Sequence, residues 1–198
     1  MNYTKLNVGS RDVIKPSSEG WLNIDIDPLG KGSNFLQMDV FDMPADWAEQ
    51  FEEIQAIHVL EHINRNRRLD FVKALYRVTK VGGMCYIEVP NFQETIRLLH
   101  EAYTASPRDH AEVHKWTTSI YGKQRSPGDQ HCWGFDLWTL AELGQDAGFV
   151  PGNWAKAYKD DKTGDRQPLL SEHYKQEPIL LMSFKKISDR ERQGKYIP

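Results

Sequence analysis

The clearest candidates for chemistry in this sequence lie within an apolar run in the first third of the chain. Residues 54–63 read IQAIHVLEHI and contain His58, Glu61 and His62. Imidazole and carboxylate groups transfer protons near neutral pH, so these side chains could act as a general base or acid. A polar stretch at 107–133 holds further histidines: His110, His114 and His131. We take His58, His114 and His131 as the candidate catalytic residues, and the sequence alone does not rank them.

The histidines of the polar stretch also raise the question of a metal. His110 and His114 are four positions apart with Glu112 between them, and His131-Cys132 follows later. In the metalloprotease helix the glutamate directly follows the first histidine. Glu112, two positions after His110, would face away from both imidazoles. We therefore expect no metal site.

Alternating strand and helix patterns position these residues. Helical periodicity occurs at 69–78, 95–103 and 137–147. Segments with the length and apolar pattern of strands lie at 5–8, 22–26, 34–40, 54–63, 84–89, 154–158 and 178–186. The alternation predicts an α/β fold with a doubly wound, mostly parallel sheet. The last two strands have no helix between them, which predicts an antiparallel C-terminal hairpin. Ligands of such sheets bind at the carboxyl ends of the strands.

The connection after the first strand is unusually short. Gly9 ends that strand, and the next strand begins at Trp21. This is near the lower limit of about 10–12 residues for a parallel connection, so its helix should be stunted or absent. The turn also does not contain the GxGxxG fingerprint that a nicotinamide enzyme would need.

The length of 198 residues corresponds to one domain. We expect a single domain over residues 1–187, with 107–133 as a substrate-side insert or lid. Residues 188–198 form a charged tail without a core-forming pattern.

Two groups of side chains near the candidate site have two interpretations each. Tyr121, Trp133 and Phe135 could stack on an acceptor or pin the insert to the core. Arg65, Arg67 and Arg68 could bind an anionic group or form the solvated start of a helix.

Composition limits the possible partners. Lys and Arg total 25 against 28 Asp and Glu, a formal net charge of −3, so no global basic field favours nucleic acid or an anionic membrane. No apolar run approaches the ~20 residues that span a bilayer, and the first residues do not have a signal-peptide pattern. Two cysteines, Cys85 and Cys132, make no disulfide framework. We expect a cytoplasmic protein of undetermined oligomeric state.

Several motifs follow one another in a characteristic order. They are LNVGS at 6–10, GWLNIDIDP at 20–28, DVFDMP at 39–44, HVLEHI at 58–63, VGGMCYIEVPN at 81–91 and HCWGFDLWTLAELGQDAGF at 131–149. In this order the sequence resembles the Rossmann-type, class I S-adenosylmethionine-dependent methyltransferases, and among them a compact group with a LEH motif on strand four. The resemblance implies a seven-stranded sheet with its last strand inserted antiparallel. It also implies S-adenosylmethionine bound over the ends of the first four strands.

The resemblance further implies a set of cofactor-binding residues. They are Val8, Gly9, Ser10, Asp25, Ile26, Asp39, Val40, His58 and Glu61. Asp25 matches the acid that binds the ribose diol, where a carboxylate makes strong charge-assisted bonds, and Asp27 lies two residues further on. Asp39 matches the position that meets adenine, and Gly9 matches the turn beside the amino-acid end. His58 matches the residue under the cofactor that faces the substrate.

The expected function is methyl transfer from S-adenosylmethionine to a small-molecule or glycan acceptor, O- or N-directed, with S-adenosylhomocysteine as product. The thioether leaves as a neutral group, so most of the acceleration can come from in-line positioning, on the order of 7–11 kcal/mol. A hydroxyl acceptor would also need a base such as histidine. The alternative is a catalytically inactive methyltransferase-like binding or partner protein, because Gly9 is the only glycine of its turn.

Overall fold

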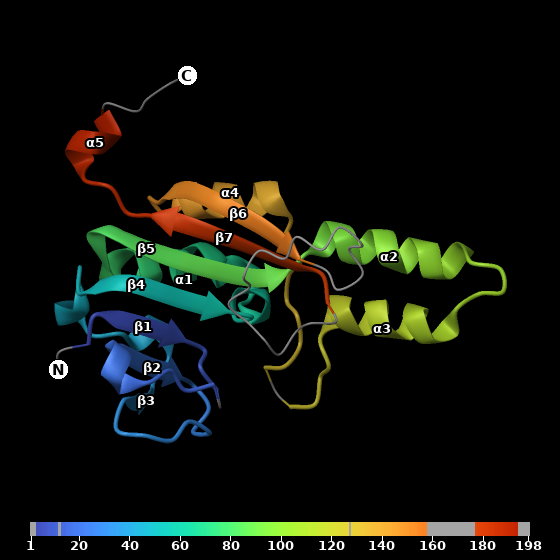
Figure 1. Ribbon diagram of the computed structural model, residues 1–198, viewed down its shortest axis with the longest axis horizontal. Helices are drawn as coiled ribbons and strands as arrows, with labels where there is room; N and C mark the ends of the chain where they lie inside the picture. The colour runs from blue at the N-terminus through green and yellow to red at the C-terminus, as the bar shows by residue number, and fades with distance from the viewer. Residues whose placement is uncertain (1–2, 12, 127, 158–176, 194–198) are drawn as a thin grey trace.

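A computed structural model of the chain describes residues 3–11, 13–126, 128–157 and 177–193 (Figure 1). Its centre is a seven-stranded sheet of order β3-β2-β1-β4-β5-β7-β6. The strands are β1 Lys5–Val8, β2 Trp21–Asp25, β3 Phe35–Gln37, β4 Phe51–Ile57, β5 Thr79–Pro90, β6 Val150–Ala157 and β7 Ile179–Lys185. β1 to β5 pair in parallel, and β7 is antiparallel to both β5 and β6. The predicted mostly parallel sheet with an antiparallel C-terminal hairpin is confirmed.

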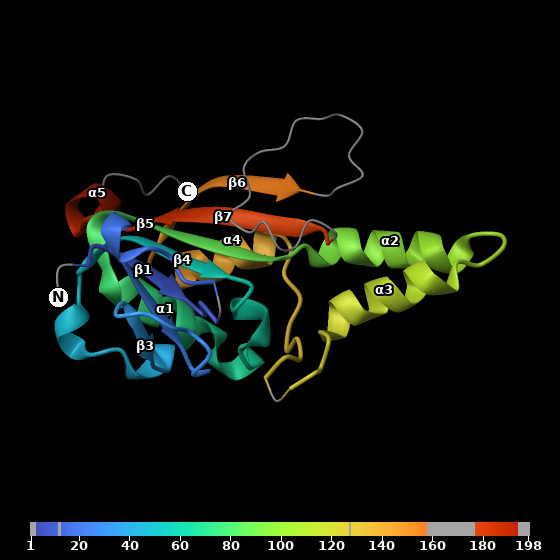
Figure 2. The same ribbon diagram turned by 60° about the horizontal axis from the view of Figure 1, so that its bottom comes forward.

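The helices divide into those that cover the sheet and those that extend beyond it. The α-helices are α1 Arg68–Val78, α2 Phe92–Thr104, α3 His110–Tyr121, α4 Leu137–Asp146 and α5 Asp189–Gln193. Short 3-10 helices are η1 Ser17–Glu19, η2 Val40–Asp42, η3 Ala45–Trp47, η4 Leu60–His62 and η5 Arg65–Arg67. α1 and α4 contact each other and lie on the same side of the sheet (Figure 2). Within the described ranges, every helix is too short or too polar to cross a bilayer.

The core lies between the sheet and α1. Leu6, Leu22 and Ile54 occupy one register row across β1, β2 and β4, and all three are buried. Helix α1 adds four buried side chains at helical spacing: Phe71, Val72, Leu75 and Val78. Because strand side chains alternate between the two faces, the residues between these apolar positions lie on the opposite face of the sheet.

That opposite face carries asparagines that bind the short β1–β2 connection. Asn7 Nδ2 donates to the carbonyl of Val13 at 3.0 Å. Asn23 accepts from the Lys15 N–H and donates to the Lys15 carbonyl, both at 2.9 Å. In the described part of this connection the only helix is η1, so the expected loss of a crossover helix is confirmed. Side-chain amides here satisfy backbone groups that a helix would otherwise pair internally.

Several sequence-based boundaries are wrong. β5 begins at Thr79 and β6 at Val150, rather than at residues 84 and 154. β4 ends at Ile57 rather than at residue 63, because His58 turns the chain and LEH forms η4. β3 is shorter than 34–40, because Asp39 caps η2. The stretch 107–133, interpreted as irregular, contains the 12-residue helix α3.

Helix α3 owes its formation to one cap and one buried ring. Asp109 accepts from the Glu112 N–H at 3.0 Å, and Trp116 is buried. α3 packs against α2, and the two form a helical hairpin that projects beyond the carboxyl ends of β4 and β5 (Figure 1). In the tail, Arg192 Nη2 of α5 donates to the Tyr76 hydroxyl at 2.9 Å, while 194–198 lie outside the described residues.

The turn after β1 requires glycine for two reasons. Gly9 has φ +68°, and its N–H donates to the Ile24 carbonyl at 2.9 Å. A Cβ on Gly9 would lie 2.2 Å from Cγ2 of Val59, which follows β4. The ends of β1 and β4 therefore pack so closely that a side chain at residue 9 would force them apart.

Replacing Gly9 tests this contact. We expect Gly9→Ala to lower the free energy of unfolding by roughly 2–4 kcal/mol, because left-handed strain and overpacking add. Gly82→Ala is the matched control: Gly82 has φ +85° with no atom within 4 Å of its Cβ position, so it should lose only about 1 kcal/mol. Urea unfolding followed by circular dichroism measures both changes. An equal loss of unfolding free energy in the two variants would show that the contact between residue 9 and Val59 does not affect stability.

Candidate functional site

The candidate site lies at the carboxyl edge of the first four strands. Ser10 follows β1, Asp25 ends β2, Asp39 precedes η2, and His58 follows β4. β1 lies between β2 and β4, so this is the point where the strand order reverses. Backbone bonds tie the ends together: the Ser10 N–H donates to the Ile24 carbonyl at 3.2 Å, and the Met38 N–H to the Asp25 carbonyl at 2.7 Å. The structure thus places the residues of the expected cofactor site along one edge.

The Asp25 carboxylate organises the loops on either side of it. One oxygen accepts the Arg11 N–H at 2.7 Å and the other accepts the Asp27 N–H at 2.8 Å. Each carboxylate oxygen keeps further acceptor capacity after one such bond. Next to it Ile26 is 63% exposed, and Asp27 is exposed as well. Asp25 therefore stabilises the fold and still presents acceptors beside an apolar surface.

The other expected cofactor residues differ in what they present. Val8 and Val40 are buried in the core, so their side chains are not available at the edge. Asp39 Oδ1 accepts the Phe41 N–H at 3.0 Å as the cap of η2, and the residue is half-buried. Ser10 Oγ is buried and, among the described residues, has no hydrogen-bond partner. An unpaired buried hydroxyl at this edge is a polar group that a ligand could satisfy.

His58 is held between two buried carboxylates. Its Nδ1 lies 3.1 Å from Glu61 Oε1 and its Nε2 3.4 Å from Glu88 Oε1. The side chains of His58, Glu61 and Glu88 are 6%, 2% and 0% exposed. The backbone of His58 is left-handed, with φ +53°, and its N–H donates to the Glu88 carbonyl at 2.9 Å. This strained conformation turns the chain out of β4 and into η4.

The two carboxylates determine the charge of His58. Burial alone would lower the pKa of His58, but the hydrogen bonds and negative charges of Glu61 and Glu88 raise it to about 9. Burial alone would raise the pKa of Glu61, and the bond to His58 brings it below its ordinary value instead. At neutral pH His58 is therefore an imidazolium without the lone pair that a base needs. Glu88, which the sequence analysis missed, is the single acid in the strand stretch MCYIEV.

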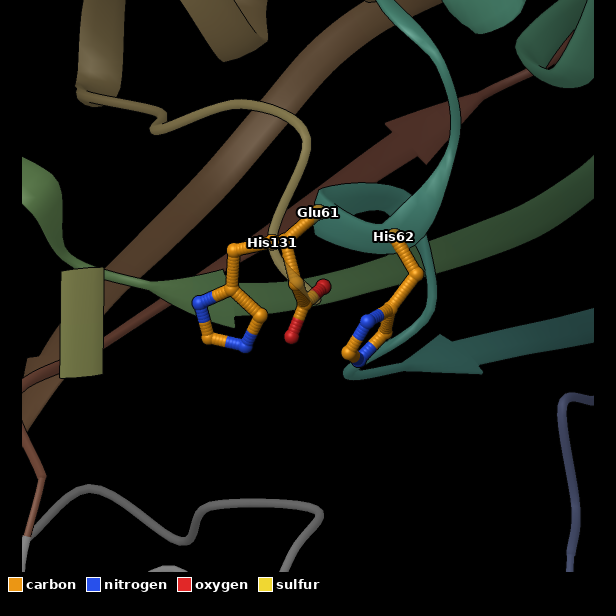
Figure 3. A group of neighbouring side chains, drawn as sticks. All are labelled: Glu61, His62 and His131. Atoms are coloured by element: carbon orange, nitrogen blue, oxygen red, sulfur yellow. The ribbon is translucent and has the colours of Figure 1, made fainter. Parts of the chain in front are cut away.

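The chain returns to this edge through residues 131–135, here called the return segment. The N–H groups of Cys132 and Trp133 both donate to the Glu61 carbonyl, at 2.7 and 3.3 Å. This brings the His131 ring next to that of His62, with centroids 5.0 Å apart (Figure 3). Burial lowers the pKa of His131, so its imidazole is neutral at pH 7. His131 joins the site although it lies 69 positions after His62 in the sequence.

A pocket opens between η4, the return segment and the C-terminal end of α3. Its lining includes His58, Glu61, His62, Ser119, Asp129 and His131. His110 and His114 are exposed on α3 and do not line this pocket. Of the three histidines expected to be catalytic, the structure brings His58 and His131 together and leaves His114 apart.

The arginines after η4 contact aromatic rings. The guanidinium of Arg68 lies 4.2 Å and that of Arg65 5.0 Å from the Trp133 ring centroid. Arg67 stacks on Phe41 at 3.5 Å. Phe135 is buried in the core, which favours the pinning role for the return segment. Arg65 and Arg68 thus attach the return segment to the start of α1, and Arg67 attaches η2.

Comparison with known proteins identifies the fold. No protein-family model matches this sequence, and no curated protein sequence matches it either. The structure resembles 1,6-didemethyltoxoflavin-N1-methyltransferase from Burkholderia thailandensis, solved with S-adenosylhomocysteine, with a TM-score of 0.58 and 12% identity over 94% of this chain and 72% of that one.

Two further solved structures agree. A SAM-dependent methyltransferase from Archaeoglobus fulgidus matches with a TM-score of 0.59 and 13% identity over 92% of this chain and 86% of its own. The N-methyltransferase NodS from Bradyrhizobium japonicum, also in complex with S-adenosylhomocysteine, matches with a TM-score of 0.55 and 12% identity. The match covers 94% of this chain and 79% of NodS. The strand order and the antiparallel β7 together with these likenesses show that the chain has the class I S-adenosylmethionine-dependent methyltransferase fold.

Proposed function

We propose that this protein transfers a methyl group from S-adenosylmethionine to an oxygen or nitrogen of a small-molecule or glycan acceptor. The observation that carries the proposal is the convergence of Ser10, Asp25, Ile26 and Asp39 on the strand edge where open α/β sheets bind ligands. The histidine-lined pocket described above adjoins the same edge at β4 and supplies a place for the acceptor.

The residues present fit such a cofactor. The remaining acceptor capacity of Asp25 suits a ribose diol, and the exposed Ile26 side chain offers an apolar surface to an adenine ring. The second oxygen of Asp39 suits the adenine amine, and the unpaired Ser10 hydroxyl suits the polar amino-acid end. S-adenosylmethionine would supply an activated methyl group whose departing thioether is neutral.

The role of the chain itself is to position. The His58 imidazolium, bonded to Glu61 and Glu88, holds η4 rigidly between the proposed cofactor edge and the acceptor pocket. Thr118, Ser119 and Asp129 give that pocket a polar lining, and Ser119 Oγ has no partner within the described part of the chain. Such a lining suits an acceptor rich in hydroxyl groups. Holding acceptor and methyl in line can supply roughly 7–11 kcal/mol.

A second candidate function is binding without catalysis. Val59 covers the Cα of Gly9, and both oxygens of Asp25 already accept backbone N–H groups. These contacts favour a protein that keeps the fold for recognition only. Cofactor binding separates the two candidates.

Calorimetry with S-adenosylmethionine and S-adenosylhomocysteine tests the proposal. We expect one-to-one binding, weakened at least about tenfold by Asp25→Ala, because the diol loses a charged acceptor. Asp25→Ala should also lower the free energy of unfolding by about 1.5–3 kcal/mol, since the N–H groups of Arg11 and Asp27 lose their partner. Asp27→Ala removes an exposed carboxylate and is the matched control. We expect it to change cofactor affinity and the free energy of unfolding only slightly.

The outcomes are distinct. No binding at millimolar cofactor would overturn methyl transfer and favour the binding protein. Binding that survives Asp25→Ala but is lost in Asp27→Ala would assign the ribose to Asp27 instead.

A positioning role for His58 has a stability signature. We expect His58→Gln to lower the free energy of unfolding by roughly 3–5 kcal/mol, because it leaves two buried carboxylates without a cation. His114→Gln, at an exposed site on α3, should change it by less than about 0.5 kcal/mol. Urea unfolding of both variants measures the difference, and equal stability would contradict the positioning role.

A further inference from the structure

We propose that Glu61, His62 and His131 bind a divalent transition-metal ion of the Zn²⁺ type. One potential ligand atom from each residue lies within 4.8 Å of the other two. Figure 3 shows the three side chains projecting in the same direction, Glu61 and His62 from η4 and His131 from the return segment. From the sequence we expected no metal site, on a candidate set of His110, His114 and the later His131-Cys132. His110 and His114 are exposed on α3, and only His131 of that set belongs to this group.

The hydrogen bonds of the two histidines prepare them as ligands. His62 Nδ1 lies 3.0 Å from the Gln130 carbonyl oxygen, and His131 Nδ1 lies 2.9 Å from that of Ser119. A carbonyl can only accept, so each Nδ1 carries a proton, and in the neutral ring the lone pair then lies on Nε2. Metal-binding histidines are oriented in this way by a bond from the other ring nitrogen.

Glu61 presents an unsatisfied carboxylate oxygen. Its Oε1 binds His58, whereas Oε2 has no hydrogen-bond partner among the described residues although the side chain is only 2% exposed. A buried carboxylate oxygen without a partner is costly, and a cation at this point would satisfy it. This second observation is independent of the histidine geometry.

The donor set selects the class of ion. Two imidazole nitrogens and one carboxylate oxygen suit Zn²⁺, while Mg²⁺ and Ca²⁺ prefer oxygen ligands alone. Bonds of about 2.0–2.2 Å in a tetrahedron place ligand atoms roughly 3.5 Å apart, so the three side chains need to approach one another by only about 1 Å to close the site. Three protein ligands leave a fourth position for water or another oxygen.

Metal titration of the full chain, without a histidine tag and after removal of bound metal by a chelator, tests the proposal. We expect one Zn²⁺ per chain by calorimetry, and with Co²⁺ the visible absorption of a tetrahedral nitrogen and oxygen site. His62→Ala and His131→Ala should each weaken Zn²⁺ binding by more than about 100-fold, because loss of outer-shell partners alone costs 10–100-fold. No nucleoside is present in these titrations, so the result does not depend on methyl transfer.

His100→Ala is the matched control, because His100 is an exposed histidine of α2 away from the site. This variant should bind Zn²⁺ with the same affinity as the unmodified chain. Melting curves of the metal-free variants check folding, and the Co²⁺ spectrum of the unmodified chain needs no variant. The proposal is overturned if the unmodified chain binds neither Zn²⁺ nor Co²⁺ stoichiometrically, if His62→Ala and His131→Ala bind as tightly as it does, or if His100→Ala alone weakens binding.

Discussion

The buried charge group of His58, Glu61 and Glu88 is the constraint on which the carboxyl edge of the sheet depends. Each of these ions would be very costly alone in the interior, and together they stabilise one another only in one arrangement. That arrangement joins the end of β4 to the end of β5. It also determines the direction of the Glu61 carbonyl, which binds the return segment. The sheet edge, η4 and the insert are therefore linked through a single carboxylate residue.

Much of the architecture could be predicted from the sequence because it depends on local apolar pattern. The mostly parallel sheet follows from the alternating elements, and the missing crossover helix follows from the number of residues between Gly9 and Trp21. What could not be predicted depends on contacts between distant segments. His58 leaves β4 in a left-handed conformation and pairs with Glu88 of another strand, and α3 buries Trp116 within a largely polar stretch of sequence. Neither the pairing of His58 nor the burial of Trp116 is visible in a local window of sequence.

In the candidate site, too, local motifs could be predicted from the sequence and contacts between distant segments could not. Asp25 and Gly9 were identified from motifs, and both lie at the expected edge. Their partners were not foreseen: backbone N–H groups occupy part of Asp25, and Val59 packs on Gly9. The grouping of His131 with Glu61 and His62 required the fold, since the return segment approaches η4 only through backbone bonds and arginine stacking on Trp133.

The large separation along the chain between the two halves of the pocket has a kinetic meaning. The Cys132 N–H reaches the Glu61 carbonyl across a loop of 71 positions, whereas neighbouring strands β1 and β2 meet after a much shorter one. A contact between residues that are distant in the sequence forms more slowly than one between near residues, because closing the longer loop costs more conformational entropy. During refolding the pairing of β1 with β2 should thus form first, and the contact between η4 and the return segment should form in a later step.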